Sequence, residues 1–257
     1  MAFDENPASF YDELADDYHL IFADWDASIA RQARVISALL REHGMRSGTV
    51  LDASCGIGTQ ALGLAAAGFS VTATDISAAS VKRCAREAVA RGLAITTAVA
   101  DLRVLDIPGA GTFDAALSFD NALPHLLSDD DLNAACASLR QVLRSEGTLL
   151  ASIRDYDALL RERPTGDLPR RFTTSTGERL VFQVWEWESQ DIYTVRHFIM
   201  DSRADGWTVT ERRTTYRALR RPVLSEALLA AGFRDVTWRM PEQTGFYQPV
   251  VTARAAS

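Results

Sequence analysis

A short glycine loop between a buried strand and a helix is the feature that most constrains how this chain can fold. Residues 49–53 form an apolar run with β-branched side chains, which predicts a buried strand. Residues 61–67 are strong helix formers, and Gly56 and Gly58 lie between the two segments. Glycine permits a tight turn and lets backbone N–H groups approach a ligand closely. The stretch therefore predicts a strand, a turn that can face a ligand, and a helix.

Strand and helix patterns alternate from this unit to residue 153. The predicted strands are residues 49–53, 70–74, 95–100, 113–118 and 147–153. The predicted helices are residues 60–67, 78–91 and 130–144. This alternation predicts an α/β fold built on a doubly wound, mostly parallel sheet. In such a sheet ligands bind beyond the carboxyl ends of the strands, which is where the glycine loop lies.

The segments on either side of this core have different patterns. Before it, aromatic and apolar residues at helical spacing predict one or two helices over residues 10–40, either packed on the core or forming a lid over the loop. After it, three segments alternate like the strands of an antiparallel meander: residues 180–187, 192–200 and 207–216. The end of the chain predicts one helix and two strands: residues 222–231, 235–240 and 250–253.

We expect a seven-stranded sheet with the antiparallel strands inserted after its fifth strand. The chain then divides into four regions: a helical lid (1–48), a cofactor-binding core (49–161), an antiparallel insertion that forms the substrate region (162–216), and a helix with strands that complete the core (217–257).

Composition and charge restrict the class of protein. Apolar residues make up 47% of the 257 residues and charged residues 24%, which is typical of a globular core. The net charge of −7 argues against a general nucleic-acid binder. The longest apolar run, residues 61–69, is too short to span a bilayer, and residues 1–5 are acidic and lack a signal-peptide pattern. We therefore expect neither a nucleic-acid partner nor a membrane span.

Cysteine and histidine usage indicates a reducing compartment and no metal site. Cys55, Cys84 and Cys136 are odd in number and scattered, which favours a cytoplasmic location. Neither these cysteines nor the four histidines have the paired spacing of metal ligands, so we expect no metal. No pattern distinguishes a monomer from a homo-oligomer.

Three aspartates mark successive predicted strands. Asp52 lies in the first strand, Asp75 follows the second and Asp101 follows the third. A carboxylate after the second strand can accept hydrogen bonds from a ribose diol, and Asp101 is close enough to meet an adenine amino group. NAD and S-adenosylmethionine both offer adenosine to such a site. The loop can satisfy a pyrophosphate pattern, but a carboxylate at Asp52, four residues before Gly56, favours a positively charged sulfonium.

Two segments resemble motifs of a known superfamily. VLDASCGIG at residues 50–58 resembles motif I of the class I S-adenosylmethionine-dependent methyltransferases, and VTATDIS at residues 71–77 resembles the motif that follows it. The chain is most similar to the glycine N-methyltransferase and glycine/sarcosine methyltransferase group, with gaps, from about residue 11 to residue 251. The resemblance implies a Rossmann-like methyltransferase fold and S-adenosylmethionine as the cofactor.

Two later segments carry the resemblance to that group. DNALPHL at residues 120–126 is similar to the group's Gly-Asn-Ser-x-x-His-Leu after strand four, with Asp120 in place of the glycine and Ala122 in place of the serine. RDYD at residues 154–157 matches the group's Arg-Asn-Tyr-Asp after strand five at three of four positions. The departures imply that the acceptor pocket need not be the group's own.

The resemblance also implies roles for individual residues. The cofactor would be bound by Tyr11, Arg31, Asp52, Ala53, Gly56, Gly58, Asp75, Ile76, Asp101, Leu102 and Asn121. The catalytic and acceptor-binding residues would be Asn121, His125, Arg154, Tyr216 and Tyr247. Chemistry supports Arg154 independently, because an arginine just past a central strand can hold a carboxylate in a bidentate fork. His125 can serve as a base or as a wall of the pocket.

These observations predict transfer of a methyl group from S-adenosylmethionine to a small molecule, most simply to the nitrogen of a carboxylate-bearing amine such as glycine or sarcosine. Oxygen, sulfur and carbon acceptors stay open, as does chemistry without methyl transfer, such as intramolecular attack on the cofactor. A nicotinamide dehydrogenase would use the loop for a pyrophosphate. A nucleic-acid N-methyltransferase would be expected to carry an Asn/Asp-Pro-Pro-Tyr/Phe segment after strand four, which residues 120–124 do not.

Overall fold

The computed structural model describes residues 7–174 and 177–256, so residues 1–6, on which the signal-peptide expectation rests, lie outside the described residues. The helices are α1 (Pro7–Leu14), α2 (Trp25–Glu42), α3 (Thr59–Ala66), α4 (Ala78–Ala90), α5 (Asp129–Val142), α6 (Tyr156–Glu162), α7 (Arg221–Ala230) and α8 (Pro241–Thr244), with 3₁₀ turns η1 (Tyr18–Ile21) and η2 (Leu123–His125). The strands are β1 (Thr49–Asp52), β2 (Ser70–Asp75), β3 (Ile95–Val99), β4 (Phe113–Ser118), β5 (Leu143–Ser152), β6 (Arg170–Thr174), β7 (Gly177–Trp187), β8 (Ile192–Arg203), β9 (Gly206–Arg217), β10 (Phe233–Arg239) and β11 (Val250–Ala255). Within the described ranges, no helix combines the length and the apolar character that crossing a membrane requires.

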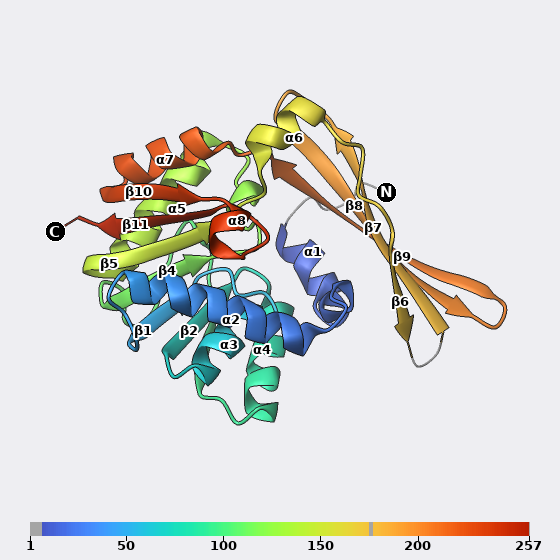
Figure 1. The fold of residues 1–257 in the computed structure, drawn as a ribbon, viewed down its shortest axis with the longest axis horizontal. Coiled ribbons are helices and arrows are strands. Elements are labelled where there is room, and N and C mark those ends of the chain that lie inside the picture. The colour runs from blue at the N-terminus through green and yellow to red at the C-terminus, as the bar shows by residue number, and fades with distance from the viewer. Residues whose placement is uncertain (1–6, 175–176, 257) are drawn as a thin grey trace.

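Seven strands form one sheet in the order β10-β11-β5-β4-β1-β2-β3. β11 runs antiparallel to β10 and β5, and the other neighbours are parallel. The strand order reverses between β1 and β4, and this reversal opens a crevice at the carboxyl ends of the strands. The predicted doubly wound, mostly parallel seven-stranded sheet is confirmed (Figure 1).

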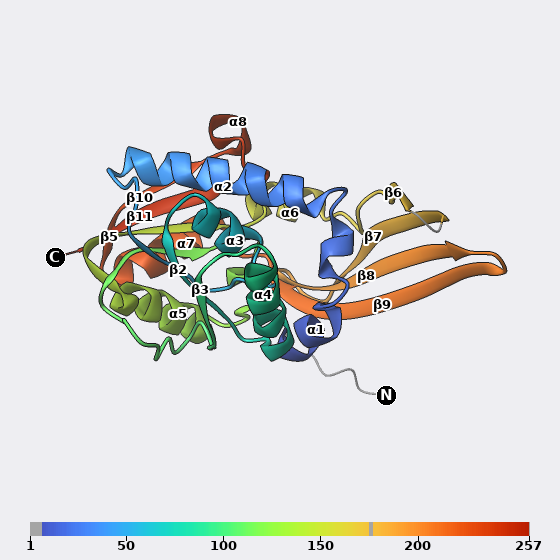
Figure 2. The same cartoon turned by 90° about the horizontal axis from the view of Figure 1, so that it is seen from below.

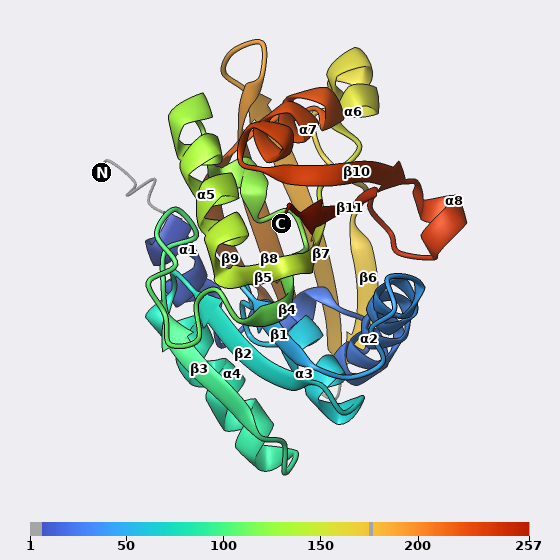
Figure 3. The same ribbon diagram turned by 90° about the vertical axis from the view of Figure 1, so that its left-hand side faces the viewer.

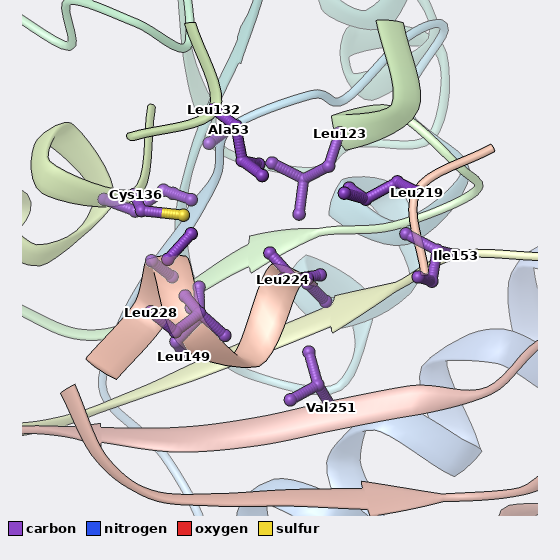
Figure 4. Close-up of a cluster of buried hydrophobic side chains, with 14 of the residues drawn as sticks. Ala53, Leu123, Leu132, Cys136, Leu149, Ile153, Leu219, Leu224, Leu228 and Val251 are labelled. Atoms are coloured by element: carbon purple, nitrogen blue, oxygen red, sulfur yellow. The ribbon is translucent and has the colours of Figure 1, made fainter. Parts of the chain in front are cut away.

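The sheet is buried on both faces because successive residues of a strand point to opposite sides. Val50 packs in a cluster with residues of α2 and α3, whereas Leu51 packs with residues of α5 and α7, and both are fully buried. Figure 3 shows α2, α3 and α4 on one side of the sheet and α5 and α7 on the other. Figure 4 shows the second layer, where Leu228 of α7 lies beside Leu149 of β5.

Helix α2 is a layer of this core. Its Ile36 and Leu40 are fully buried in the same cluster as Val50. The helix begins after Asp24, whose side chain accepts a hydrogen bond from Ala27 N at 2.9 Å and so satisfies one of the unpaired N–H groups of the first turn. Residues 25–42 of the region expected as a lid (1–48) thus pack on the sheet, which is one of the two arrangements expected for this stretch.

The insertion after the fifth strand forms a second sheet. β6, β7, β8 and β9 pair in that order, all antiparallel, and this sheet extends away from the core at the carboxyl ends of the central strands (Figures 1 and 2). Helix α1 lies between the two sheets, and its Phe10 and Leu14 pack on Val181 and Ile199. The predicted antiparallel meander is confirmed, with β6 as an additional strand.

Hydrogen bonds also join α1 to the core. Asp12 Oδ1 accepts from Ser77 Oγ at 2.6 Å and from Ala79 N at 2.9 Å, at the start of α4. A carboxylate is favourable at this place because the first N–H groups of a helix have no partner within it. Helix α1 thus connects the first turn of α4 to the second sheet.

Besides the turn η2, three short elements have no counterpart in the predicted pattern: α6, β6 and α8. Helix α6 begins after Asp155, whose side chain caps Ala158 N, and Tyr156 is its one buried residue. A seven-residue helix with a single buried position has no 3.6-residue periodicity from which it could be predicted.

The packing of α7 predicts a sharp contrast between two neighbouring leucines. Leu228 is fully buried, whereas Leu229 is 55% exposed. We expect Leu228→Ala to lower the free energy of unfolding by about 2–5 kcal/mol, because it removes buried apolar surface and leaves a cavity. Leu229→Ala on the same helix should change it by about 0.5 kcal/mol or less. Urea denaturation followed by circular dichroism measures both, and equal effects would contradict this packing.

Candidate functional site

The glycine loop joins β1 to α3, and its two glycines serve different purposes. Gly56 has φ +51° and Gly58 has φ +99°, both in the left-handed region that favours glycine. A Cβ at Gly58 would lie 2.8 Å from Cys84 Sγ, so packing beneath the loop also requires glycine there. A Cβ at Gly56 would meet nothing within 4 Å, and this residue borders open space.

That open space is a cavity at the carboxyl ends of β1, β2 and β3, which we call the loop cavity. It encloses about 1040 Å³ with its open mouth included. Among the residues predicted to bind the cofactor, it is lined by Tyr11, Ala53, Gly56, Asp75, Ile76, Asp101 and Leu102. Asp52 and Gly58 are buried and do not line it. The structure therefore brings together residues that follow three successive strands.

Asp75 holds two loops together at this cavity. Its Oδ2 accepts a hydrogen bond from Gly56 N at 2.8 Å, and its Oδ1 accepts from Ser77 N at 2.9 Å. Each carboxylate oxygen can accept a further bond, so both can still receive a ribose hydroxyl. Burial raises the pKa of Asp75, and the two amide donors oppose that shift. The geometry is compatible with ribose binding.

Asp101 is less available than the sequence predicts. Arg103 binds its carboxylate in a fork, with Nη2 2.6 Å from Oδ2 and Nε 3.1 Å from Oδ1. Arg103 also contacts Asp131 at 2.9 Å, so the three charges form a partly exposed cluster that borders the loop cavity. The hydrogen bonds from Arg103 lower the pKa of Asp101. An adenine amino group bound there would share Asp101 with Arg103, and the apolar side chains of Ile76 and Leu102 line the same cavity.

Asp52 is a buried carboxylate without an internal counter-charge. It is fully buried, and neither of its carboxylate oxygens has a hydrogen-bond partner within the described residues. The amides of Ser54 and Ala61 are near enough to favour its charged form but do not meet hydrogen-bond geometry. Burial, reinforced by the Asp75 carboxyl, raises the pKa of Asp52 to about 8. A cation bound at the loop would favour the charged carboxylate.

Tyr11, His125 and Tyr216 form a hydrogen-bonded chain beside the loop cavity. His125 Nδ1 lies 3.2 Å from Thr215 O, and because a carbonyl oxygen only accepts, Nδ1 carries the ring proton. Nε2 then accepts from Tyr11 OH at 2.9 Å, and Tyr11 accepts from Tyr216 OH at 3.3 Å. Burial lowers the pKa of His125 to about 3. His125 is therefore a neutral group that orients Tyr11. Of the two roles expected for it, this favours a wall of the pocket over a catalytic base.

A second, larger cavity adjoins the first, and we call it the arginine cavity. It encloses about 1950 Å³ with its mouth included, and it shares Tyr11, Tyr18 and Asp120 with the loop cavity. Of the predicted site residues, it is lined by Tyr11, Arg31, Asn121, Arg154, Tyr216 and Tyr247. Arg31 and Asn121 line this cavity and not the loop cavity, which differs from the cofactor contacts predicted for them.

Arg154 is a half-buried cation that neutral groups hold in place. Its Nη1 donates to Tyr193 OH and its Nη2 donates to Gln183 Oε1, both at 3.0 Å. Its guanidinium carbon lies 4.7 Å from the ring centroid of Trp185 and 5.5 Å from that of Tyr216. No carboxylate within residues 7–174 and 177–256 forms an ion pair with it at 4.0 Å or less. Guanidinium has five N–H donors, so donors are left for an anion.

Asn121 positions Arg154. Its Oδ1 accepts from Arg154 N and from Tyr156 OH, each at 3.0 Å. Tyr156 OH lies 2.9 Å from the hydroxyl of Tyr193, which in turn contacts the guanidinium. The backbone of Asn121 is left-handed at φ +71°, a conformation that asparagine tolerates better than most residues. Its side-chain amide is thus bonded to Arg154 N and Tyr156 OH, on the side of the arginine cavity.

Asp120 is a candidate functional residue to which the sequence assigns no role. It follows β4, and its Oδ2 accepts from Gln60 Nε2 at 2.8 Å while its Oδ1 accepts from Tyr247 OH. Burial raises its pKa. The signal that identifies it is its place in the topology: Asp120 comes two residues after β4, at the same edge of the parallel sheet where Asp75 ends β2.

The charges around the loop suit a cation. Asp52, Asp75 and Asp120 lie near one another, and none of them forms an ion pair with another described residue. A pyrophosphate would add negative charge beside three acidic side chains and would oppose their ionisation, and the Gly56 N–H that it would require is already donated to Asp75. A sulfonium adds a positive charge instead, which would offset the acidic side chains, including Asp52 beneath the loop with its two unpartnered oxygens. The residues present therefore fit S-adenosylmethionine better than a dinucleotide.

Comparison with known proteins agrees with this chemistry. Residues 50–147 match the methyltransferase domain family. A glycine/sarcosine N-methyltransferase of Parasynechococcus marenigrum (strain WH8102) is 36% identical over 137 residues, which are 53% of this chain and 48% of that protein. The chain spans about half the length of the curated relatives it matches.

Solved structures share the fold over nearly the whole chain. Streptomyces venezuelae DesVI aligns with a TM-score of 0.80 at 17% identity, over 94% of this chain and 98% of that one. The S-adenosylmethionine-bound CalS10, an amino pentose methyltransferase from Micromonospora echinaspora, aligns with a TM-score of 0.75 at 18% identity, over 89% and 92% of the two chains. At these identities the likeness concerns the fold alone. Residues 50–147 of this chain therefore match a methyltransferase domain, and the chain as a whole shares its fold with these solved structures.

Proposed function

We propose that the protein transfers the methyl group of S-adenosylmethionine to the nitrogen of a small amine that carries a carboxylate, such as glycine or sarcosine. The observation that carries this proposal is Arg154, a cation with free donors and no acidic partner within the described residues, in a cavity that adjoins the loop cavity. A half-buried cation is stabilised by an anion, and a substrate carboxylate supplies one in the geometry that guanidinium binds best. The glycine/sarcosine N-methyltransferase named among the relatives supports the same acceptor class.

The mechanism requires little chemistry from the protein itself. When bound, S-adenosylmethionine supplies a methyl group already activated by positively charged sulfur. The residues of the chain align the acceptor with it and exclude water, effects that can lower a barrier by about 7–11 kcal/mol. In this proposal Arg154 fixes the carboxylate end of the acceptor, and the amine nitrogen reaches the loop cavity past the shared wall of Tyr11 and Tyr18. His125 holds the hydroxyl of Tyr11 and so keeps this wall in one position.

The dimensions of the arginine cavity support acceptors larger than glycine as well. Its empty space is about 1950 Å³ against about 1040 Å³ for the loop cavity, both with their mouths included. The rings of Trp185 and Tyr216 border it next to Arg154. Aromatic faces stabilise alkylammonium groups, so N-methylated and larger amino acids belong to the proposed acceptor class.

We also propose that the enzyme works in a reducing compartment, the cytoplasm. Cys55, Cys84 and Cys136 are all buried free thiols, which supports this location.

An acceptor screen tests the proposed reaction directly. The protein is incubated with S-adenosylmethionine and with glycine, sarcosine, larger amino acids and matched amines that lack the carboxylate, such as ethanolamine. We expect S-adenosylhomocysteine and an N-methylated product from carboxylate-bearing amines, and at least about tenfold less from the matched amines, because Arg154 then has no anion to bind. Liquid chromatography with mass spectrometry measures both products. Formation of methylthioadenosine without any N-methylated product would contradict methyl transfer.

Removal of the Asp75 carboxylate should weaken cofactor binding. We expect Asp75→Ala to raise the dissociation constant of S-adenosylhomocysteine on the order of 100-fold, because it removes charged acceptors for the ribose and releases the amides of Gly56 and Ser77. Asp101→Ala is the matched control. We expect it to raise the dissociation constant of S-adenosylhomocysteine by less than about tenfold, because Arg103 already binds that carboxylate. Isothermal titration calorimetry measures both. Equal losses would mean that the two aspartates contribute alike, contrary to their different environments.

Removal of the Arg154 guanidinium should affect the acceptor and spare the cofactor. We expect Arg154→Ala to raise the KM of the acceptor on the order of 100-fold, while the dissociation constant of S-adenosylhomocysteine changes by less than about threefold. Arg161→Ala is the matched control, because this exposed arginine lies at the end of α6, outside the arginine cavity. Unchanged acceptor kinetics in Arg154→Ala would refute the carboxylate clamp.

A further inference from the structure

Asp120 lies where the two cavities meet. Within the described residues it lines both the loop cavity and the arginine cavity, together with Tyr11 and Tyr18. Its backbone is left-handed at φ +57°, and its N–H donates to Ser152 Oγ at 2.9 Å, which holds the turn after β4. A non-glycine residue in this conformation is uncommon, and such residues concentrate at functional sites. Asp120 is thus a carboxylate held at the junction between donor and acceptor spaces.

The charge of this carboxylate is not neutralised by an ion pair. The groups that stabilise it at close range are uncharged: the amide of Gln60 at 2.8 Å, the hydroxyl of Tyr247 and the side-chain amide of Gln32. Arg31 acts on it electrostatically, but no basic group of the described residues lies within 4.0 Å. Each oxygen accepts one bond from the protein and can accept another. The carboxylate can therefore still bind an ammonium group or take up a proton.

A methyl acceptor of the amine class needs such a group at this place. An aliphatic amine is mostly protonated at neutral pH and then has no lone pair with which to attack. Its positive charge would also repel the sulfonium in the adjoining cavity. His125 cannot take the proton, because its pKa is low and its Nε2 already accepts from Tyr11.

We propose that Asp120 is the catalytic base of the amine methylation, an inference that rests on the proposed function. The substrate ammonium gives one proton to the carboxylate of Asp120, which leaves a neutral amine with a free electron pair. The N–C bond then forms from that pair as the C–S bond breaks, and the electrons of the broken bond stay on sulfur as a neutral thioether. The product leaves as a methylated ammonium, and Asp120 returns its proton to solvent, so charge and protons balance.

The environment of Asp120 supports this role. Burial raises its pKa towards that of the ammonium, which makes it a stronger base than an exposed aspartate. The donors Tyr247 and Gln60 oppose this shift, because they stabilise the charged form. The titratable and charged groups that act on it from neighbouring elements are Tyr18 of η1, Arg31 of α2, Asp52 of β1 and Tyr247 before β11.

The test uses Asp120→Asn, which preserves shape, and Tyr247→Phe, which removes one donor to the carboxylate. The kcat/KM for glycine, and for the best amine of the screen, is measured from pH 6 to 10. We expect Asp120→Asn to lower kcat/KM at pH 7 by about 10²–10⁴-fold. Its remaining activity should rise about tenfold per pH unit as the amine loses its proton in solution. Tyr247→Phe should move the acid limb of the profile to higher pH, because loss of the donor raises the pKa of Asp120.

A second acceptor separates loss of a base from loss of structure. Aminooxyacetate carries the carboxylate, but its nitrogen is already neutral at pH 7 and needs no base. We expect Asp120→Asn to slow its methylation by less than about tenfold, while the variant binds S-adenosylhomocysteine within about threefold of the wild type. The assignment would be overturned if Asp120→Asn lost as much kcat/KM with aminooxyacetate as with glycine. It would also be overturned if the pH profile of Asp120→Asn for glycine matched that of the wild type.

Failure of the proposed function gives a different result. In that case no carboxylate-bearing amine yields S-adenosylhomocysteine with the wild-type protein, whatever the behaviour of Asp120. Infrared difference spectra between wild type and Asp120→Asn, with S-adenosylmethionine bound, then measure whether the Asp120 carboxyl group is ionised, independently of any methyl transfer. An ionised carboxylate at pH 7 that takes up a proton on acidification supports a base, and a carboxyl group already protonated at pH 7 overturns it.

Discussion

Ionisable side chains that are removed from water without an internal counter-charge govern the site of this protein. Asp52, Asp75, Asp120 and Arg154 are all buried or half-buried, and none of them forms an ion pair within the described part of the chain. Two unit charges 4 Å apart interact by about 4 kcal/mol at an effective dielectric constant of 20, which is a large part of a typical stability of about 5–15 kcal/mol. Ligands of opposite charge would therefore stabilise the site: a cationic cofactor beside the aspartates and, in the proposed function, the carboxylate of the acceptor at Arg154.

The geometry of the site depends on contacts between regions that are far apart in the sequence. Tyr11 of α1 meets His125 of η2 and Tyr216 of β9, and the first and last of these are 205 positions apart. The ring centroids of His125 and Tyr216 lie 4.1 Å apart, so packing reinforces the hydrogen bonds. Asp12 ties the same helix to the first turn of α4. The N-terminal segment, the core and the second sheet thus define together the wall that the two cavities share.

Much of the fold could be predicted because its signals are local. Apolar strands and amphipathic helices alternate along residues 49–153, and this alternation predicts the parallel sheet without any knowledge of contacts. The short elements α6, β6 and α8 could not be predicted, because they are too brief to show a period. The position of α2 was equally hidden, because an amphipathic stripe such as Ile36 and Leu40 looks the same in a lid and in a core layer.

The sequence by itself determined the sheet, the glycine loop and the presence of aspartates where the strands end, because periodicity and glycine conformation act between near neighbours. It also determined that an arginine, Arg154, follows the fifth strand. Tertiary structure alone decided which of these groups can still bind a ligand. Arg103 binds the carboxylate of Asp101, Tyr11 is hydrogen-bonded to Nε2 of His125, and Asp120 lies between two cavities. The physical reason is that burial and hydrogen-bond partners set the pKa and the reach of a side chain, and both depend on residues that only the folded chain brings together.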